Sequence, residues 1–210
     1  MTLAVMSAAT KHAITAFSVL GVAGQAIIAL FLLIGLLAAL GIRGPLDLLR
    51  RLCWGYELWA GFVVASVATG GSLFYSEIAQ FTPCEFCWYQ RICMYPLSIL
   101  LLVFAWKGQH RASRYLLALP IGGAGISIYH MLIQYGAIRE PAGCLISAPG
   151  VGCNFNWLAG QPPYGVDASF GYLSIPTLAL TGFLLLIGFL VLASSGAGEE
   201  TATLPADAER

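Results

Sequence analysis

Five apolar runs, each long enough to cross a lipid bilayer, constrain this chain more than any other feature. They cover approximately residues 13–42, 58–78, 86–106, 115–137 and 170–194. A helix needs about 20 residues to cross roughly 30 Å of hydrocarbon. Lipid cannot satisfy free backbone groups, and no run alternates as a barrel strand does, so each run is predicted to be a helix.

Composition agrees with a membrane location. Of the 210 residues, 59% are hydrophobic and 10% are charged, whereas soluble domains have about 25% charged residues. So few charges cannot cover the apolar surface of a soluble domain. Ten basic and ten acidic residues give zero net charge, which offers no basic surface to nucleic acid. The chain is therefore predicted to be an all-α integral membrane protein.

Basic residues indicate how the chain is oriented. They gather in the loops after the first and third runs: Arg43, Arg50, Arg51, Lys107, Arg111 and Arg114. The positive-inside rule places both loops in the cytoplasm. Residues 196–210 then form a cytoplasmic tail that is predicted to be disordered. The first run is about twice as long as the core of a secretory signal, so we expect a retained span, with removal as the alternative.

The six cysteines are unevenly distributed: Cys53, Cys84, Cys87, Cys93, Cys144 and Cys153. On this topology four of them lie at the outer face, as the pairs Cys84/Cys87 and Cys144/Cys153, the second in a loop over about residues 138–169. Two structural disulfides, or one disulfide and two packed thiols, would explain such pairs. A zinc site made by all four cysteines is a further alternative. Cys53 and Cys93 are expected to be packed free thiols.

The first pair lies at the predicted start of a membrane helix. Thr82, Pro83 and Glu85 fit a capping box, with Thr82 as N-cap and Pro83 at the first helical position. Residues three apart lie on one helix face, at a spacing that a disulfide can bridge. The N–H groups and positive partial charge of a helix N-terminus stabilise a thiolate. Redox-active cysteines are therefore a second interpretation of this pair.

Arg91 lies four residues beyond Cys87 and is predicted to share the face of the two cysteines. A charged residue inside a membrane helix costs a few kcal/mol, so a functional role is the default expectation. Its guanidinium could stabilise a Cys87 thiolate and donate to a carbonyl oxygen of a bound ligand. Alternatively, Arg91 extends to the lipid headgroups, and Trp88, Tyr89 and Tyr95 form an interfacial aromatic belt.

The run CEFCWYQRICMYP at residues 84–96 resembles the motif of the DsbB/BdbC family of disulfide bond formation proteins. The resemblance extends to SLFYSEIAQFTP before it, IYHMLIQ around His130 and GYLSIPTLAL at the last run. It covers about residues 58–195 and implies a four-helix transmembrane bundle. The chain is thus divided into an N-terminal helix and basic loop at 1–57, the bundle at 58–195 and the tail at 196–210.

The resemblance implies a quinone-dependent thiol oxidase that reoxidises a DsbA-type thioredoxin-fold protein in the inner membrane of a bacterium. Cys87 matches the cysteine that engages the quinone, either ubiquinone or menaquinone, and Cys84 matches its redox partner. Cys144 and Cys153 match the loop pair, with Cys144 forming the mixed disulfide. Arg91 matches an arginine of the quinone site. His130 lies near a histidine linked to that site, although a packed histidine is the alternative.

Two departures from the family pattern affect these expectations. Only eight residues separate Cys144 from Cys153, so the order of thiol exchanges can differ, and the first apolar run is additional to the four-helix pattern. A vitamin K epoxide reductase-like enzyme is a second hypothesis, but that family has its C-x-x-C on the last core helix. A non-catalytic membrane subunit with structural disulfides is a third.

Overall fold

The computed structural model describes residues 8–141, 144, 153 and 172–202, and its regular elements there are all helical. In chain order they are α1 (Ala8–Ala39), α2 (Gly44–Cys53), α3 (Glu57–Leu73), the π-helix η1 (Phe74–Ile78), α4 (Glu85–Trp106), the 3₁₀ helix η2 (Arg111–Leu117), α5 (Ala118–Gln134) and α7 (Ile175–Ala202). The predicted all-α fold is confirmed.

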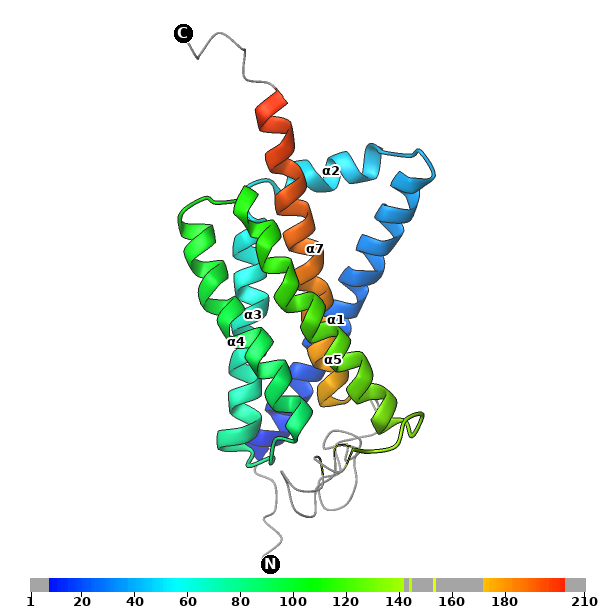
Figure 1. Cartoon of the computed structure of the whole chain (residues 1–210), viewed down its shortest axis with the longest axis vertical. Coiled ribbons are helices and arrows are strands. Elements are labelled where there is room, and N and C mark those ends of the chain that lie inside the picture. Colours follow the sequence, from blue (N-terminus) through cyan, green and yellow to red (C-terminus); the bar gives the residue numbers. More distant parts are fainter. Residues whose placement is uncertain (1–7, 142–143, 145–152, 154–171, 203–210) are drawn as a thin grey trace, which may run out of the picture.

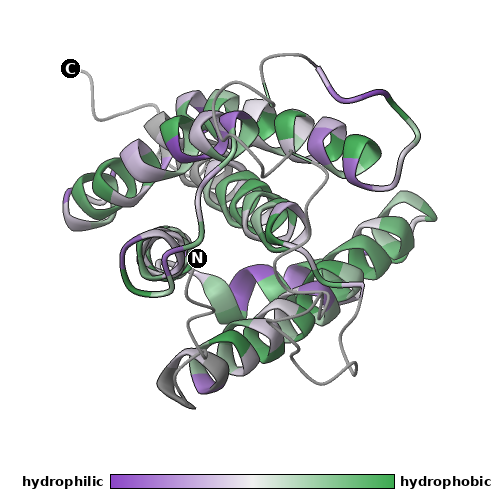
Figure 2. Ribbon diagram, turned by 90° about the horizontal axis from the view of Figure 1, so that it is seen from below, coloured by the Kyte–Doolittle hydropathy of each residue, from purple (hydrophilic) through white to green (hydrophobic). Residues whose placement is uncertain are grey.

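Within the described residues, five helical segments are long and apolar enough to span a membrane. They cover His12–Ala39, Glu57–Ile78, Glu85–Trp106, Ser113–Gln134 and Ile175–Ser195. Each overlaps one of the apolar runs of the sequence. Figure 2 shows that apolar residues cover much of the circumference of these helices, and leucines such as Leu32 and Leu36 are exposed. An outer surface of this kind suits lipid and not water.

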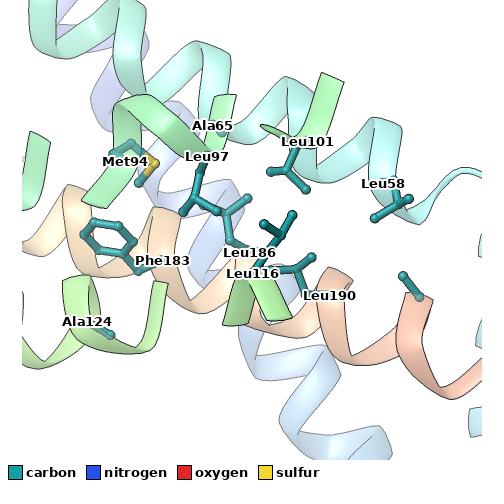
Figure 3. Packing of buried hydrophobic residues seen from close by; sticks show 11 residues of the cluster. Leu58, Ala65, Met94, Leu97, Leu101, Leu116, Ala124, Phe183, Leu186 and Leu190 are labelled. Carbon is teal, nitrogen blue, oxygen red and sulfur yellow. The ribbon is translucent and has the colours of Figure 1, made fainter. Parts of the chain in front are cut away.

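Helices α3, α4, α5 and α7 pack around one apolar core. Its centre includes Leu97 and Leu101 of α4 and Phe183 and Leu186 of α7, all of them fully buried. Figure 3 shows Phe183 between Met94 and Ala124 in this core. A Cβ atom on Gly123 would lie 2.3 Å from the Phe183 ring, so the glycine lets α5 approach α7 closely. Helix α1 packs on α7 from outside this group.

The helix ends divide into two groups at opposite ends of the molecule. The start of α1, the start of α4 and the end of α5 lie at the lower end in Figure 1. Helix α2, the connection between α4 and η2, and the C-terminal end of α7 lie at the upper end. The two basic loops of the sequence therefore lie at one end, as the positive-inside argument requires.

Two segments differ from their predicted structure. The loop containing Arg50 and Arg51 forms α2, an amphipathic helix that lies across the upper end of the bundle (Figure 1) and has no buried residue. Helix α7 continues to Ala202, so the prediction of a disordered tail is wrong for residues 196–202. Residues 203–210, and most of the predicted outer loop at 138–169, lie outside the described residues.

Candidate redox site

Helix α4 begins two residues later than the capping box predicts. Its N-cap is Cys84, which has an extended backbone, and its Sγ accepts a hydrogen bond from the N–H of Cys87 at 3.4 Å. The prediction of Thr82 as N-cap is therefore wrong. A sulfur takes the position that a Ser, Thr or Asp oxygen usually holds, because the N–H at the third helical position needs an acceptor. The capping interaction itself thus lies within the C-x-x-C pair.

The two sulfurs of this pair face each other. Cys84 Sγ lies 2.8 Å from Cys87 Sγ, with both cysteines free. Hydrogen bonding from the Cys87 thiol lowers the pKa of Cys84 from its ordinary value of 9.0 to about 5, an effect that burial opposes and that His130 and the Cys87 N–H support. A thiolate at Cys84 is the form that nucleophilic exchange with a disulfide needs.

His130 lies between the two cysteine pairs. Its side chain extends from α5, and the residue is 2% exposed. Nε2 is 3.6 Å from Cys84 Sγ and 3.0 Å from the carbonyl oxygen of Cys153. One ring nitrogen thus faces a sulfur of the first pair and the backbone of the second. A histidine that only packs in the core would not need these two polar contacts of Nε2.

Cys144 and Cys153 form a disulfide with a Cα–Cα distance of 5.6 Å. Both residues are buried, and they pack in one cluster with Cys84 and Ile133. The N–H of Cys153 donates to a carboxylate oxygen of Glu140, which ties the second cysteine to the chain that leaves α5. The fold therefore brings the two cysteine pairs into contact with the same side chains.

Arg91 points into the bundle. Its Nε donates to Ser72 Oγ at 3.0 Å, and its Nη2 donates to the Ser72 carbonyl oxygen at 3.1 Å. The guanidinium also lies over the Trp88 ring, 5.0 Å from the centroid. Tyr95 donates its hydroxyl hydrogen to Ser72 Oγ at 3.3 Å. These partners lie on α3 and α4, so the guanidinium is held against the protein by both helices.

A cavity of about 370 Å³ adjoins these side chains, a volume in the range of small-molecule sites. Its polar end is lined by Cys84, Cys87, Gln90, Arg91 and His130. Most other lining residues are apolar and come from α1, α3 and α7. A ligand with a small polar ring and an apolar extension matches this division between the two ends.

A metal ion is the other ligand that this cluster could hold. Ligand atoms of Cys84, Cys87 and His130 lie within 4.8 Å of one another. Two thiolates on a tetrahedral zinc ion, with Zn–S bonds of about 2.3 Å, lie roughly 3.8 Å apart, whereas these sulfurs are 2.8 Å apart. Cys144 and Cys153 are bonded to each other, so the four-cysteine zinc site does not form in this structure. The geometry favours a dithiol.

The remaining cysteines lie away from the cavity. Cys93 is half-buried and packs against the main core of the bundle. Cys53 ends α2 at the opposite end of the molecule (Figure 1). Partial burial and, to a smaller extent, the negative charge of nearby Glu57 raise the pKa of Cys53 above its ordinary value. The thiolate form of Cys53 is therefore disfavoured. Neither position suits electron exchange with the clustered pairs.

The six predicted site residues lie in one region: Cys84, Cys87, Arg91, His130, Cys144 and Cys153. Several residues that contact them were not predicted. Gln90 is buried and donates to Ser127 Oγ at 3.1 Å. Its position three residues beyond Cys87 was an available signal, because that spacing keeps a residue on the cysteine face. Ser72 and Glu140 gave no such signal, because their partners are distant in the sequence.

The chain resembles proteins of known families. Residues 55–193 match the family model described as "Disulfide bond formation protein DsbB". "Disulfide bond formation protein C" of Bacillus subtilis is 42% identical over 139 residues, which cover 64% of this chain and 90% of that protein. A "Probable disulfide formation protein" of Deinococcus radiodurans is 38% identical, over 64% of this chain and 86% of the relative. No solved structure matches the chain. Because the family model covers more than half of the chain, the protein belongs to the DsbB family of disulfide bond formation proteins.

Proposed function

We propose that this protein oxidises a DsbA-type thioredoxin-fold protein on the outer face of a bacterial inner membrane and transfers the electrons to a membrane quinone. Membership in the DsbB family supports thiol–disulfide oxidation as its activity. The observation that carries the proposal is the contact of both cysteine pairs in one cluster, beside a cavity that contains Arg91. Structural disulfides alone need no such cavity.

Electrons enter at the loop pair. A thiolate of the reduced donor attacks Cys144 Sγ, which breaks the Cys144–Cys153 bond and forms a mixed disulfide. The second donor thiol then attacks the donor sulfur of that bond and releases an oxidised donor. Two electrons and two protons have moved to Cys144 and Cys153. Because Cys144 is fully buried, its sulfur must become accessible before the donor can attack it.

The second step moves the same two electrons to the helix pair. Cys153 attacks Cys84 of an oxidised Cys84–Cys87 pair, and Cys144 then resolves the mixed disulfide. The loop disulfide is restored, and Cys84 and Cys87 become reduced. His130 faces both Cys84 Sγ and the Cys153 backbone, so it holds the two pairs together and stabilises the Cys84 thiolate that leaves.

The residues at the polar end of the cavity fit a quinone. Arg91 and Gln90 supply fixed hydrogen-bond donors for a carbonyl oxygen, and the apolar walls exclude water. When bound there, a quinone would accept two electrons and two protons. Cys84 and Cys87 lose those electrons and protons as their disulfide forms again. Both ubiquinone and menaquinone satisfy this description.

Quinone absorbance provides the test. Purified protein in lipid is mixed with a reduced thioredoxin-fold donor and either quinone, and the loss of quinone is followed. We expect turnover by the unsubstituted protein and none by Cys84→Ser or Cys87→Ser. Cys93→Ser is the matched control, because Cys93 is on the same helix but does not line the cavity, and it is expected to keep turnover. Undiminished quinone reduction by Cys84→Ser or Cys87→Ser contradicts the proposal.

The two other hypotheses make different predictions. A vitamin K epoxide reductase-like enzyme has its C-x-x-C on the last core helix, whereas here the pair opens α4, the second of the four bundle helices. A non-catalytic subunit predicts disulfides that no donor reduces. A donor whose second cysteine is serine can attack Cys144 and displace the Cys153 thiolate, but it cannot resolve the mixed disulfide, so we expect it to stay covalently bound to the unsubstituted protein. Failure to form this complex favours the non-catalytic hypothesis.

A further inference from the structure

Helix α1 lies outside the family match, which begins at residue 55. It nevertheless packs closely on the matched bundle. A Cβ atom on Gly24 would lie 2.9 Å from the Thr181 side chain of α7, and one on Gly71 of α3 would lie 3.0 Å from the Phe17 ring. Helix α1 therefore contacts α7 near Gly24 and α3 near Phe17.

Aromatic packing fixes the outer end of α1 to the segment that leads to the redox cysteines. The Phe17 ring lies 5.6 Å from the Tyr75 ring, which stacks on Phe81 at 5.7 Å with an interplanar angle of 7°. Ile14, Tyr75 and Phe81 form a buried cluster of their own. Phe81 is three residues before Cys84, so α1 supports the chain that presents the C-x-x-C pair.

The middle of α1, residues 17–27, forms a wall of the cavity. Its lining residues are Phe17, Leu20, Gly21, Ala23, Gly24 and Ile27. Opposite them, α3 contributes Val63 and Val67, and the polar end with Cys87 belongs to the same cavity. Leu20 and Val63 are lining residues that are also more than half exposed, at 54% and 55%. The cavity therefore reaches the lipid-facing surface between α1 and α3.

We infer that α1 completes the acceptor site: the apolar chain of a lipid-soluble quinone lies between α1 and α3 and leaves the protein at Leu20 and Val63. This inference rests on the proposed function. A polar ring held near Cys87 and Arg91 has to direct its chain along the remaining apolar length of the cavity. That length ends at the bilayer, where such a chain is soluble. The site is thus built from five helices, one of which the family model lacks.

The test compares two acceptors that share a ring: a quinone without a chain, and the same quinone with an isoprenoid chain. The measured quantity is the KM for the quinone with the chain divided by the KM for the quinone without it. Leu20→Trp and Val63→Trp narrow the opening between α1 and α3, so we expect this ratio to rise on the order of ten-fold. Leu36→Trp is the matched control, because Leu36 is on α1, exposed and not a lining residue, and its ratio is expected to equal that of the unsubstituted protein.

An unchanged ratio in both Leu20→Trp and Val63→Trp overturns the role of α1. If the unsubstituted protein reduces neither quinone, the proposed function fails, and this inference fails with it. A second measurement needs no variant: a quinone with a photoreactive group on its chain is bound to the unsubstituted protein and illuminated. Labelling within residues 17–27 supports the inference, whereas labelling confined to α4 and α5 overturns it.

Discussion

The sulfur of Cys84 combines three roles that usually belong to separate atoms. It caps α4, accepts a hydrogen bond from Cys87 and faces His130. Each of these contacts favours the thiolate over the thiol, because each brings a hydrogen or a positive partial charge to the sulfur. The reactivity of this cysteine is therefore a property of its neighbours, and two variants can separate their contributions.

Alkylation of reduced protein tests the thiolate directly. Because the Cys87 thiol is the main cause of the lowered pKa of Cys84, which is about 5, the rate at Cys84 should reach half of its maximum near pH 5. The pKa of Cys84 is lower in the folded protein than in the unfolded chain. The Cys84 thiolate therefore adds to the free energy of unfolding at alkaline pH, and this contribution is lost as the pH falls through 5. In Cys87→Ala the midpoint should move toward 9. A midpoint near 9 in the unsubstituted protein contradicts this assignment.

His130→Ala removes the ring that faces Cys84 and the Cys153 backbone. Because His130 contributes to the low pKa of Cys84, the alkylation midpoint should rise, and quinone reduction should slow because a higher pKa makes Cys84 a poorer leaving group. Ser127→Ala is the control, since Ser127 is on the same helix but has its hydrogen bonds with Gln90 and Gly123. Equal midpoints for His130→Ala and Ser127→Ala argue against the role of His130.

Helix lengths could be predicted well from the sequence, whereas helix ends and short elements could not. The apolar runs set the five spans because lipid admits few other structures. The N-cap was missed because a cysteine sulfur replaced the expected Thr82 oxygen. The amphipathic α2 was missed because it has no long apolar run, and the apolar run at residues 58–78 does not indicate where α3 changes into the π-helix η1. Arg91 and the cysteines were found because they share one helix face, whereas Ser72 needed the packing of α3 against α4.

Close packing of α5 on α7 gives a prediction at the scale of elements. Gly123→Ala places a methyl group against the buried Phe183 ring, so it should lower the free energy of unfolding by about 1–3 kcal/mol. Gly125→Ala on the same helix meets nothing within 4 Å and should be neutral or stabilising, because alanine favours helices over glycine. Thermal unfolding in lipid measures both. Equal losses would show that Phe183 does not control the approach of α5.

The two ends of the molecule differ, as the positions of the basic loops in the sequence predicted. The ends of α4 and α5 near the redox site lie at one end, and the basic helix α2 lies at the other (Figure 1). Cys144 and Cys153 were expected at the same end as Cys84, and they pack in one cluster with it.

Labelling with a membrane-impermeant maleimide tests the orientation. Tyr135 at the end of α5 and Trp106 at the end of α4 are both exposed, and each is replaced by cysteine in a chain whose six native cysteines are serine. In intact cells Tyr135→Cys should react, because it lies at the redox end, whereas Trp106→Cys should react only after permeabilisation. The reverse pattern would place the redox cysteines in the cytoplasm and contradict the proposed location.

The central claim is that electrons pass from the loop pair to the helix pair. A single turnover of Cys84→Ser protein with excess reduced donor tests it most directly, because the relay is cut after its first step. We expect one donor disulfide per protein molecule, a reduced Cys144/Cys153 pair and no quinone consumed. An absence of donor oxidation, or reduction of quinone by this variant, would contradict the relay.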